Sequence, residues 1–136
     1  MKITRAGDYA LRVLGYMASE QNKGKVFMRN DLSRICGVPD SFLGKILQAL
    51  ARENILESER GKKGGFKINK SPKEITVYDI IKAVEGDIMI NECLLDKEFC
   101  ESSFNCNIQT ILGSIRNNLI KDMQKYTLQD LVAKLG

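Results

Sequence analysis

Apolar residues near the start of the chain recur every three or four positions, with polar residues between them. This spacing is that of one face of an amphipathic helix, so we predict a helix over about residues 4–19. The polar stretch Asn22-Lys23-Gly24-Lys25 breaks the pattern, and the same spacing then predicts helices over about 29–36 and 40–53. The residues that the first helix is expected to bury are Ala6, Tyr9, Ala10, Val13, Leu14 and Met17.

A tight turn, Gly37-Val38-Pro39, separates the second and third predicted helices. Proline is favoured at the first position of a helix because its φ angle is already fixed, so we expect Pro39 to begin the third helix. The side chains expected to point inward are Leu32, Ile35 and Cys36 from the second helix and Leu43, Ile46, Leu47 and Leu50 from the third.

The period of the pattern changes after the third helix. Two short segments, Ile55–Ser58 and Phe66–Ile68, have the composition of strands. The glycine-rich and basic segment 59–65 between them predicts a hairpin connection whose glycines are free to adopt φ > 0. Thr76-x-x-Asp79 resembles a capping box and predicts the start of a helix that Gly86 ends. That helix is expected to bury Val77, Ile80, Ile81 and Val84.

Residues 87–106 show no clear period, whereas helical spacing returns over about 107–125. A helix of that length spans about 28 Å, and few other elements remain to cover it. We therefore expect its apolar side to contact a second copy of the chain, the alternative being packing within its own domain. Thr127-x-x-Asp130 predicts the cap of a last helix. The predicted dimer contact consists of Ile108, Ile111, Leu112, Ile115 and Leu119.

The predicted order of helix, helix, tight turn, helix and hairpin is that of a winged helix-turn-helix. The expected fold is therefore mostly α with a small β-hairpin, followed by a long C-terminal dimerisation helix. We divide the chain into a DNA-binding domain over 1–86, a cysteine-containing loop over 87–106, and the dimerisation and C-terminal helices over 107–136. The alternative is a plain three-helix core with a hairpin.

Charge is unevenly distributed along the chain. The net charge is +4, but residues 1–85 carry +6 and the remainder −2, and eight basic residues stand against three acidic ones from Lys45 to Lys73. Such a basic half favours nucleic-acid binding, although solvated surface charge is the alternative. The residues expected to contact DNA are Pro39, Asp40, Ser41, Phe42 and Lys45 at the start of the third helix and Arg60, Gly61, Lys62 and Lys63 at the hairpin tip, with Lys67 adding positive charge beside them.

Composition excludes several classes of protein. The chain has 136 residues, 43% of them apolar, which allows one domain with a real core. Its apolar runs are too short to span a membrane, and its first residues lack a signal-peptide pattern, so we expect a cytoplasmic protein. There is no histidine, which removes histidine-based triads and zinc fingers, and without a catalytic constellation we predict a non-enzyme.

Three of the four cysteines fall within 14 residues, as Cys93-x6-Cys100-x5-Cys106. Thiolates are the usual ligands of iron–sulphur clusters, and an irregular segment can wrap around one. Zinc is the rival, but structural zinc sites usually contain a closely spaced cysteine pair and need four protein ligands. The fourth cysteine, Cys36, is expected to act as a small buried hydrophobic residue. Three unrelated thiols are the remaining alternative.

Four stretches resemble the IscR/NsrR-type family of bacterial winged-helix transcription regulators. They are Lys2-Ile3-Thr4 through Asp8-Tyr9-Ala10-Leu11-Arg12, the turn 37–39 with Phe42-Leu43, the segment Arg60-Gly61-Lys62-Lys63-Gly64-Gly65-Phe66, and Ile75–Ile81. Together with the cysteines they cover nearly the whole chain. The resemblance implies a homodimer, a palindromic operator in double-stranded DNA and, in many members, an iron–sulphur cluster held by three cysteines per subunit.

The resemblance also bears on the fourth ligand of such a cluster. Some members use a histidine three residues after the last cysteine, a position occupied here by Gln109. Members resembling nitric-oxide-sensing repressors use an aspartate from the first helix of the other subunit, which corresponds to Asp8. The alternative for Asp8 is an ordinary helical ion pair with Arg12. Because the first cysteine spacing is one residue longer than in the best-known members, the cluster type stays open, with 4Fe-4S favoured over 2Fe-2S.

These observations predict a homodimeric transcription regulator whose operator binding depends on an iron–sulphur cluster that senses redox state, nitric oxide or iron–sulphur status. One alternative is a repressor of the same family that uses bare cysteine thiols or a metabolite as its signal. An alternative of another class is an iron–sulphur carrier or assembly protein, which would lack the salt-dependent DNA affinity that the basic hairpin predicts.

Overall fold

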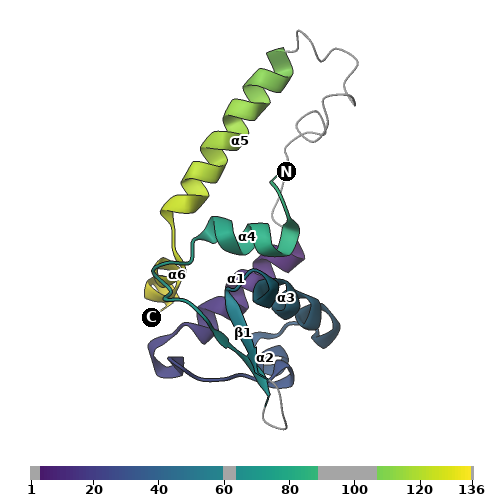
Figure 1. The fold of residues 1–136 in the computed structure, drawn as a ribbon, viewed down its shortest axis with the longest axis vertical. Coiled ribbons are helices and arrows are strands. Elements are labelled where there is room, and N and C mark those ends of the chain that lie inside the picture. Colours follow the sequence, from purple (N-terminus) through teal and green to yellow (C-terminus); the bar gives the residue numbers. More distant parts are fainter. Residues whose placement is uncertain (1–3, 60–63, 89–106, 136) are drawn as a thin grey trace.

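The computed structural model describes residues 4–59, 64–88 and 107–135 (Figure 1). A small helical domain carries one two-stranded hairpin, and a long helix extends away from it. The elements are α1 (Arg5–Met17), the short 3-10 turn η1 (Glu20–Asn22), α2 (Arg29–Cys36), α3 (Asp40–Arg52), β1 (Leu56–Glu59), β2 (Gly65–Ile68), α4 (Val77–Glu85), α5 (Asn107–Lys125) and α6 (Leu128–Leu135).

The predicted winged helix-turn-helix is confirmed. The core consists of the inward faces of α1, α2 and α3, on which Leu14, Leu32 and Leu47 are completely buried. Gly37 ends α2 with a left-handed φ of 68°, a conformation that glycine adopts without strain. Pro39 is the N-cap of α3 with ψ 134° rather than its first helical residue, and the helix begins at Asp40, where the predicted range begins.

The inward direction predicted for Ile35 is wrong, because its side chain is 48% exposed. The helix α2 has only eight residues and buries Leu32. Cys36 packs against the core from one turn further along, while Ile35 is rotated by about 100° from it toward solvent. A helix this short therefore covers the core with a narrower face than the sequence pattern indicates.

The hairpin is antiparallel, with pairs running from Leu56↔Ile68 to Glu59↔Gly65. Beyond β2, Phe27 extends the sheet by one bridge to Phe66, with the two backbone N–H···O distances being 2.7 and 2.8 Å. A Cβ atom on Gly65 would overlap the carbonyl oxygen of Phe27 and lie 2.8 Å from its carbonyl carbon. Glycine at this position thus permits close approach between strands, a different role from the positive φ that we expected of the hairpin glycines.

The predicted capping box at the start of α4 is confirmed. The Thr76 hydroxyl accepts from the Asp79 N–H and the Asp79 carboxylate accepts from the Thr76 N–H, both at 3.0 Å. The helix then buries Ile80 and Ile81 and ends before Gly86. Its packing side contacts α1, α3 and α5, so α4 links the helix-turn-helix to the long helix.

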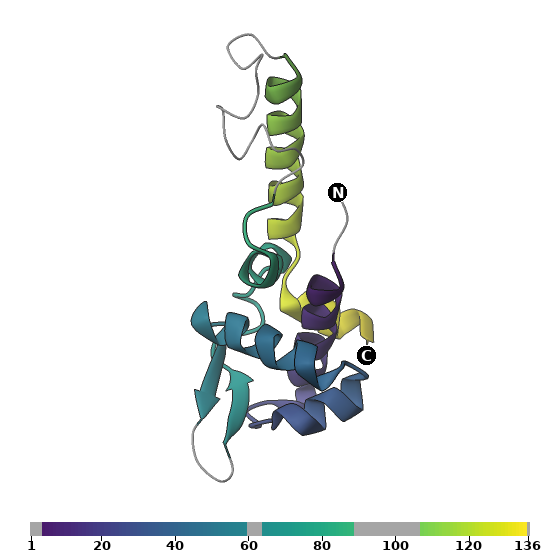
Figure 2. The same ribbon diagram turned by 90° about the vertical axis from the view of Figure 1, so that its right-hand side faces the viewer.

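The long helix α5 has the bounds that the sequence pattern predicts. Its C-terminal end packs on the domain, while the rest extends away (Figure 2). There Met123 joins a small cluster with Ile81 and Ile88. The Arg116 Nε donates to the Ile88 carbonyl at 2.6 Å and fixes the end of the segment that follows α4. None of the helices in the described ranges is long and apolar enough to cross a membrane.

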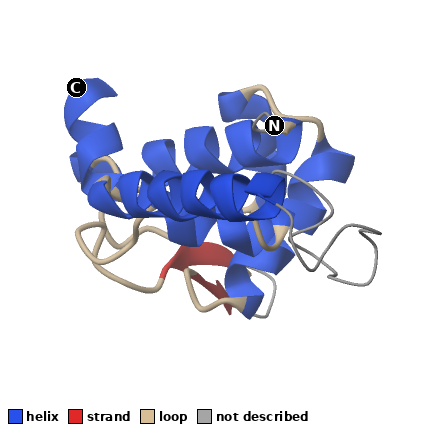
Figure 3. Cartoon of the chain, turned by 90° about the horizontal axis from the view of Figure 1, so that it is seen from above, coloured by secondary structure: helices blue, strands red, loops and turns tan. Residues whose placement is uncertain are grey.

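The last helix returns to the domain and packs against α1. The Leu128 side chain is completely buried, and its N–H donates to the Ile75 carbonyl at 2.8 Å. The predicted cap is present, since the Thr127 N–H donates to the Asp130 carboxylate at 2.9 Å. Seen from above, α5 crosses over the other helices and the hairpin lies along one side (Figure 3).

Candidate functional site

The start of α3 is joined to the start of α2 by an ion pair. The Arg29 Nε donates to the Asp40 carboxylate at 3.0 Å, and both side chains are about half exposed. The Arg29 side chain also lies against Gly44, where an added Cβ would come within 3.3 Å of its guanidinium. Asp40 is in the first turn of α3, where a carboxylate interacts favourably with the helix dipole. This pairing fixes the two helix starts relative to each other.

The other predicted contact residues on α3 are open to solvent. Pro39, Ser41 and Lys45 are exposed, and the Phe42 side chain is 43% exposed. The Phe42 ring meets the Tyr9 ring edge to face, with the centroids 5.8 Å apart. A large apolar side chain held in place yet exposed beside a hydroxyl and an ammonium group suits contact with base edges and phosphates.

The loop end of the hairpin, where the strands meet residues 60–63, lies across a hollow from the start of α2. The hollow has a volume of about 350 Å³ and lies between Met28, Arg29 and Asn30 on one side and the ends of both strands on the other. The predicted tip residues Arg60, Gly61, Lys62 and Lys63 lie outside the described residues. The start of α2, the start of α3 and the loop end of the hairpin therefore belong to one surface.

Sequence reasoning missed Arg29 as a member of this surface. The prediction considered only the third helix and the hairpin tip. The first helix of a helix-turn-helix, which is α2 here, commonly crosses the DNA backbone. A basic residue at the first position of α2 was the available signal.

Lys67 does not supply the free positive charge that we expected beside the hairpin tip. It faces two cross-strand glutamates, with its Nζ 3.2 Å from the Glu59 carboxylate and 3.6 Å from the Glu57 carboxylate. The hydrogen bond to Glu59 and the charges of both glutamates raise the pKa of Lys67 above its ordinary value. The charge of this lysine is therefore compensated within the sheet.

Asp8 lies on the outward side of α1 and is exposed. Its carboxylate accepts from the Arg12 guanidinium at 2.7 Å, so the helical ion pair considered above is present. Asp8 also borders a shallow hollow of about 380 Å³ with Thr4, Arg5 and Leu11. An exposed i,i+4 pair contributes only about 0.3–0.5 kcal/mol, so the carboxylate is available to a stronger partner.

Cys93, Cys100 and Cys106 lie outside the described residues, and within the described ranges no three metal-binding side chains come together. The described segment that precedes the cysteines is anchored. Glu85 at the end of α4 accepts hydrogen bonds from the Thr4 N–H, at 2.8 Å, and from the Thr4 hydroxyl. This contact joins the start of α1, which carries Asp8, to the helix that precedes the cysteines.

Cys36 is half-buried against the core, as we expected. Burial raises the pKa of its thiol, and the nearby Arg12 charge opposes this shift. The thiol is therefore protonated near neutral pH, which makes it a poor metal ligand and a weak nucleophile.

The predicted dimer contact on α5 is largely bare. Ile108, Ile111 and Ile115 are 61%, 59% and 49% exposed, while Leu112 is partly buried and Leu119 packs on the small cluster with Met123. The helix thus uses its C-terminal end to join its own domain and leaves an isoleucine stripe along the rest. Exposed apolar residues arranged in this way are typical of a protein interface.

Comparisons with known proteins agree with this arrangement. A family model named Rrf2, described as an iron-dependent transcriptional regulator, matches residues 3–134. Protein aau3 of Rhizobium meliloti (strain 1021) is 34% identical over 133 residues, covering 97% of this chain and 85% of that protein. The structure of T. potens IscR is similar with a TM-score of 0.75 and 18% identity, over 100% of this chain and 89% of that one.

A second solved structure is that of CymR, the global cysteine regulator of B. subtilis, with a TM-score of 0.74 and 20% identity over 98% of both chains. These likenesses confirm the predicted fold. The family model describes a transcriptional regulator, which also confirms the prediction of a non-enzyme. The chain belongs to the Rrf2 family of DNA-binding transcription regulators.

Proposed function

We propose that this protein is a homodimeric transcription regulator whose binding to a palindromic operator is controlled by an iron–sulphur cluster. The proposal of DNA binding is supported by one surface, which is formed by the starts of α2 and α3 and the loop end of the hairpin. In a winged helix-turn-helix these are the elements that enter the major groove and contact the adjacent backbone or minor groove.

The residues of this surface divide into two roles. Ser41, Phe42 and Lys45 are exposed on the first turns of α3 and are placed to meet base edges. Arg29 is half exposed beside them, and Arg60, Lys62 and Lys63 add charge at the hairpin tip, so these four suit contacts to phosphate or minor groove. Asp40, which is also predicted to contact DNA, orients Arg29 through their ion pair.

The isoleucine stripe of α5 supports the homodimer. Burying each of these side chains against a copy of the same helix stabilises the dimer by about 1.5–3 kcal/mol per fully buried residue. A two-fold contact along α5 would place two DNA-reading surfaces at a fixed spacing, which a palindromic operator matches.

The residues available for a cluster are Cys93, Cys100 and Cys106 from one subunit and Asp8 from the other. Three thiolates and a carboxylate are a suitable donor set, and Asp8 is exposed on a hollow with only a weak ion pair to release. A bound cluster supplies a redox-active centre with an exchangeable oxygen ligand. The hydrogen bond from the Thr4 N–H to the Glu85 carboxylate couples the start of α1 to the end of α4.

The experiment compares Asp8→Ala with Asp31→Ala in protein purified without oxygen. Asp31 is a matched control, since it is similarly exposed and pairs with Arg34 on the same helix at 3.3 Å. Asp8→Ala is expected to shorten the lifetime of the cluster in air, measured by absorption and iron content, whereas Asp31→Ala leaves it unchanged. Equal lifetimes for both variants would reject Asp8 as the fourth ligand.

The main alternative is a regulator of the same fold that responds through bare thiols or a metabolite. The likeness to CymR keeps this alternative open, because CymR is described as a global cysteine regulator. Protein that is colourless and free of iron after anaerobic reconstitution would favour it. An iron–sulphur carrier is disfavoured by membership of a family of transcription regulators.

A further inference from the structure

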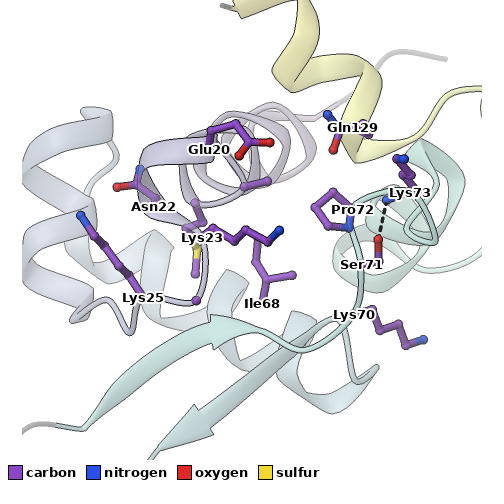
Figure 4. A pocket seen from close by; sticks show the side chains of 13 residues that line it. Glu20, Asn22, Lys23, Lys25, Ile68, Lys70, Ser71, Pro72, Lys73 and Gln129 are labelled. Atoms are coloured by element: carbon purple, nitrogen blue, oxygen red, sulfur yellow. Dashed lines mark hydrogen bonds between the residues drawn. The ribbon is translucent and has the colours of Figure 1, made fainter.

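A hollow of about 530 Å³ opens beside the end of β2 (Figure 4). The end of α1, the turn η1, the segment after β2 and the start of α6 form its walls. Its volume falls within the range of about 300–1,000 Å³ that is usual for small-molecule sites. None of the residues assigned above to DNA, dimer or cluster lines it.

The charge of this hollow is one-sided. Four lysines and one glutamate are among its lining residues, which are otherwise neutral. None of these lysines forms an ion pair in the described part of the chain. The Lys23 side chain extends over Ile68 into the hollow, whereas Lys25 and Lys70 point away from its centre (Figure 4). Unpaired ammonium groups around a concave surface attract anions.

The location argues against DNA as the occupant. The strand register puts Glu59↔Gly65 at the tip of the hairpin and Leu56↔Ile68 at its other end. Ile68 borders the hollow, which therefore lies at the end of the hairpin away from the tip. The hollow is thus separated from the tip by the length of the paired strands.

The hollow also lies where the DNA-binding part meets the C-terminal helices. The Gln129 N–H at the start of α6 donates to the Pro72 carbonyl at 3.2 Å, and both residues line the hollow. The Val77 N–H donates to the carbonyl of Tyr126, between α5 and α6, at 2.9 Å. A ligand here would contact the DNA-binding part and the helix that continues from α5.

We propose that this hollow binds a small organic anion with two or more carboxylate or phosphate groups. Lys23 contacts one anionic group from the η1 side, and Lys73 contacts another from the segment before α4. The apolar floor of Ile68 and Pro72 packs against the carbon skeleton of the ligand. Such binding needs no cluster, so the proposal is independent of the cofactor proposed above.

Isothermal titration calorimetry with citrate and with pyrophosphate at low salt tests this proposal, with glycerol as a neutral probe. Lys23→Gln and Lys73→Gln are compared with Lys121→Gln, an exposed lysine on α5. We expect saturable binding of at least one anion, weakened about tenfold by each of the first two changes through loss of a charge-assisted hydrogen bond. Lys121→Gln should leave the affinity unchanged.

Three results would overturn the proposal. One is the absence of saturable binding of either anion at concentrations up to about 10 mM. Another is equal weakening by all three variants, which indicates unspecific attraction. The third is loss of affinity for duplex DNA in Lys23→Gln with anion binding intact, which would show that the hollow is an extension of the DNA-binding surface.

Discussion

Replacing Gly65 by alanine tests whether the close approach of Phe27 stabilises the loop end of the hairpin. The added Cβ would overlap the Phe27 carbonyl, so the strand bridge between Phe27 and Phe66 must open. Opening it removes two backbone hydrogen bonds, of 2.7 and 2.8 Å, each contributing about 0.5–1.5 kcal/mol. Because opening the bridge relieves the overlap, no separate strain energy is added. We expect the free energy of unfolding to fall by about 1–3 kcal/mol.

Urea unfolding followed by circular dichroism, at one fixed protein concentration, measures this change. Gly44→Ala is the matched control. Gly44 is inside α3, and an added Cβ there meets only the half-exposed Arg29 side chain at 3.3 Å, which can shift aside. Alanine in a helix interior gains about 0.5–1 kcal/mol over glycine, so this variant should be as stable as the native protein or more so.

The expected result also has a functional side. Because the bridge holds the hairpin against the segment before α2, folded Gly65→Ala protein should bind duplex DNA more weakly than the native protein does. If the free energy of unfolding of Gly65→Ala lies within about 0.5 kcal/mol of the native value, the reasoning is refuted. Ordinary surface substitutions have effects of that size without breaking a strand bridge.

Three further changes test other parts of the account. Ile111→Glu should raise the dimer dissociation constant at least a hundredfold in analytical ultracentrifugation, because two copies lose about 1.5–3 kcal/mol each; an unchanged dimer would exclude α5 as the interface. Arg29→Ala should reduce by about one the steepness with which the logarithm of DNA affinity falls with the logarithm of salt concentration. Arg52→Ala, at the far end of α3, should leave this slope unchanged. Burial raises the pKa of Cys36 above its ordinary value of 9.0, so the unfolded chain loses this proton at lower pH than the folded one. Between about pH 8 and pH 10 the free energy of unfolding should therefore fall more in native protein than in Cys36→Ala. Parallel curves of unfolding free energy against pH would contradict this.

Local signals in the sequence predicted much of the fold. The Thr76–Asp79 capping box and the bounds of α5 depend on residues a few positions apart, so the sequence pattern was sufficient for both. The one-residue error at Pro39 is of the kind expected at any helix end.

Contacts between distant segments could not be predicted in this way. The approach of Phe27 to Gly65 and the pairing of Arg29 with Asp40 depend on the finished arrangement of the elements. The charge of Lys67 is another case, because only the strand register shows that two glutamates compensate it. Net charge along the sequence overstated the free positive charge near the hairpin.

The candidate site was predicted as residues but not as a surface. Ser41, Phe42 and Lys45 are exposed, and their assignment to DNA stays a prediction. Their connection to α2 through Arg29 emerges only from the structure.

The most direct test of the central claim is the DNA affinity of one anaerobic preparation before and after its iron is removed by a chelator. A duplex selected from random sequences for binding to the protein is the probe. If a cluster held by Cys93, Cys100, Cys106 and Asp8 controls operator binding, the protein is coloured and the two affinities differ by about fivefold or more, the usual lower range of coupling between two sites. A colourless, iron-free preparation, or a coloured one whose affinity is the same in both states, would contradict the claim.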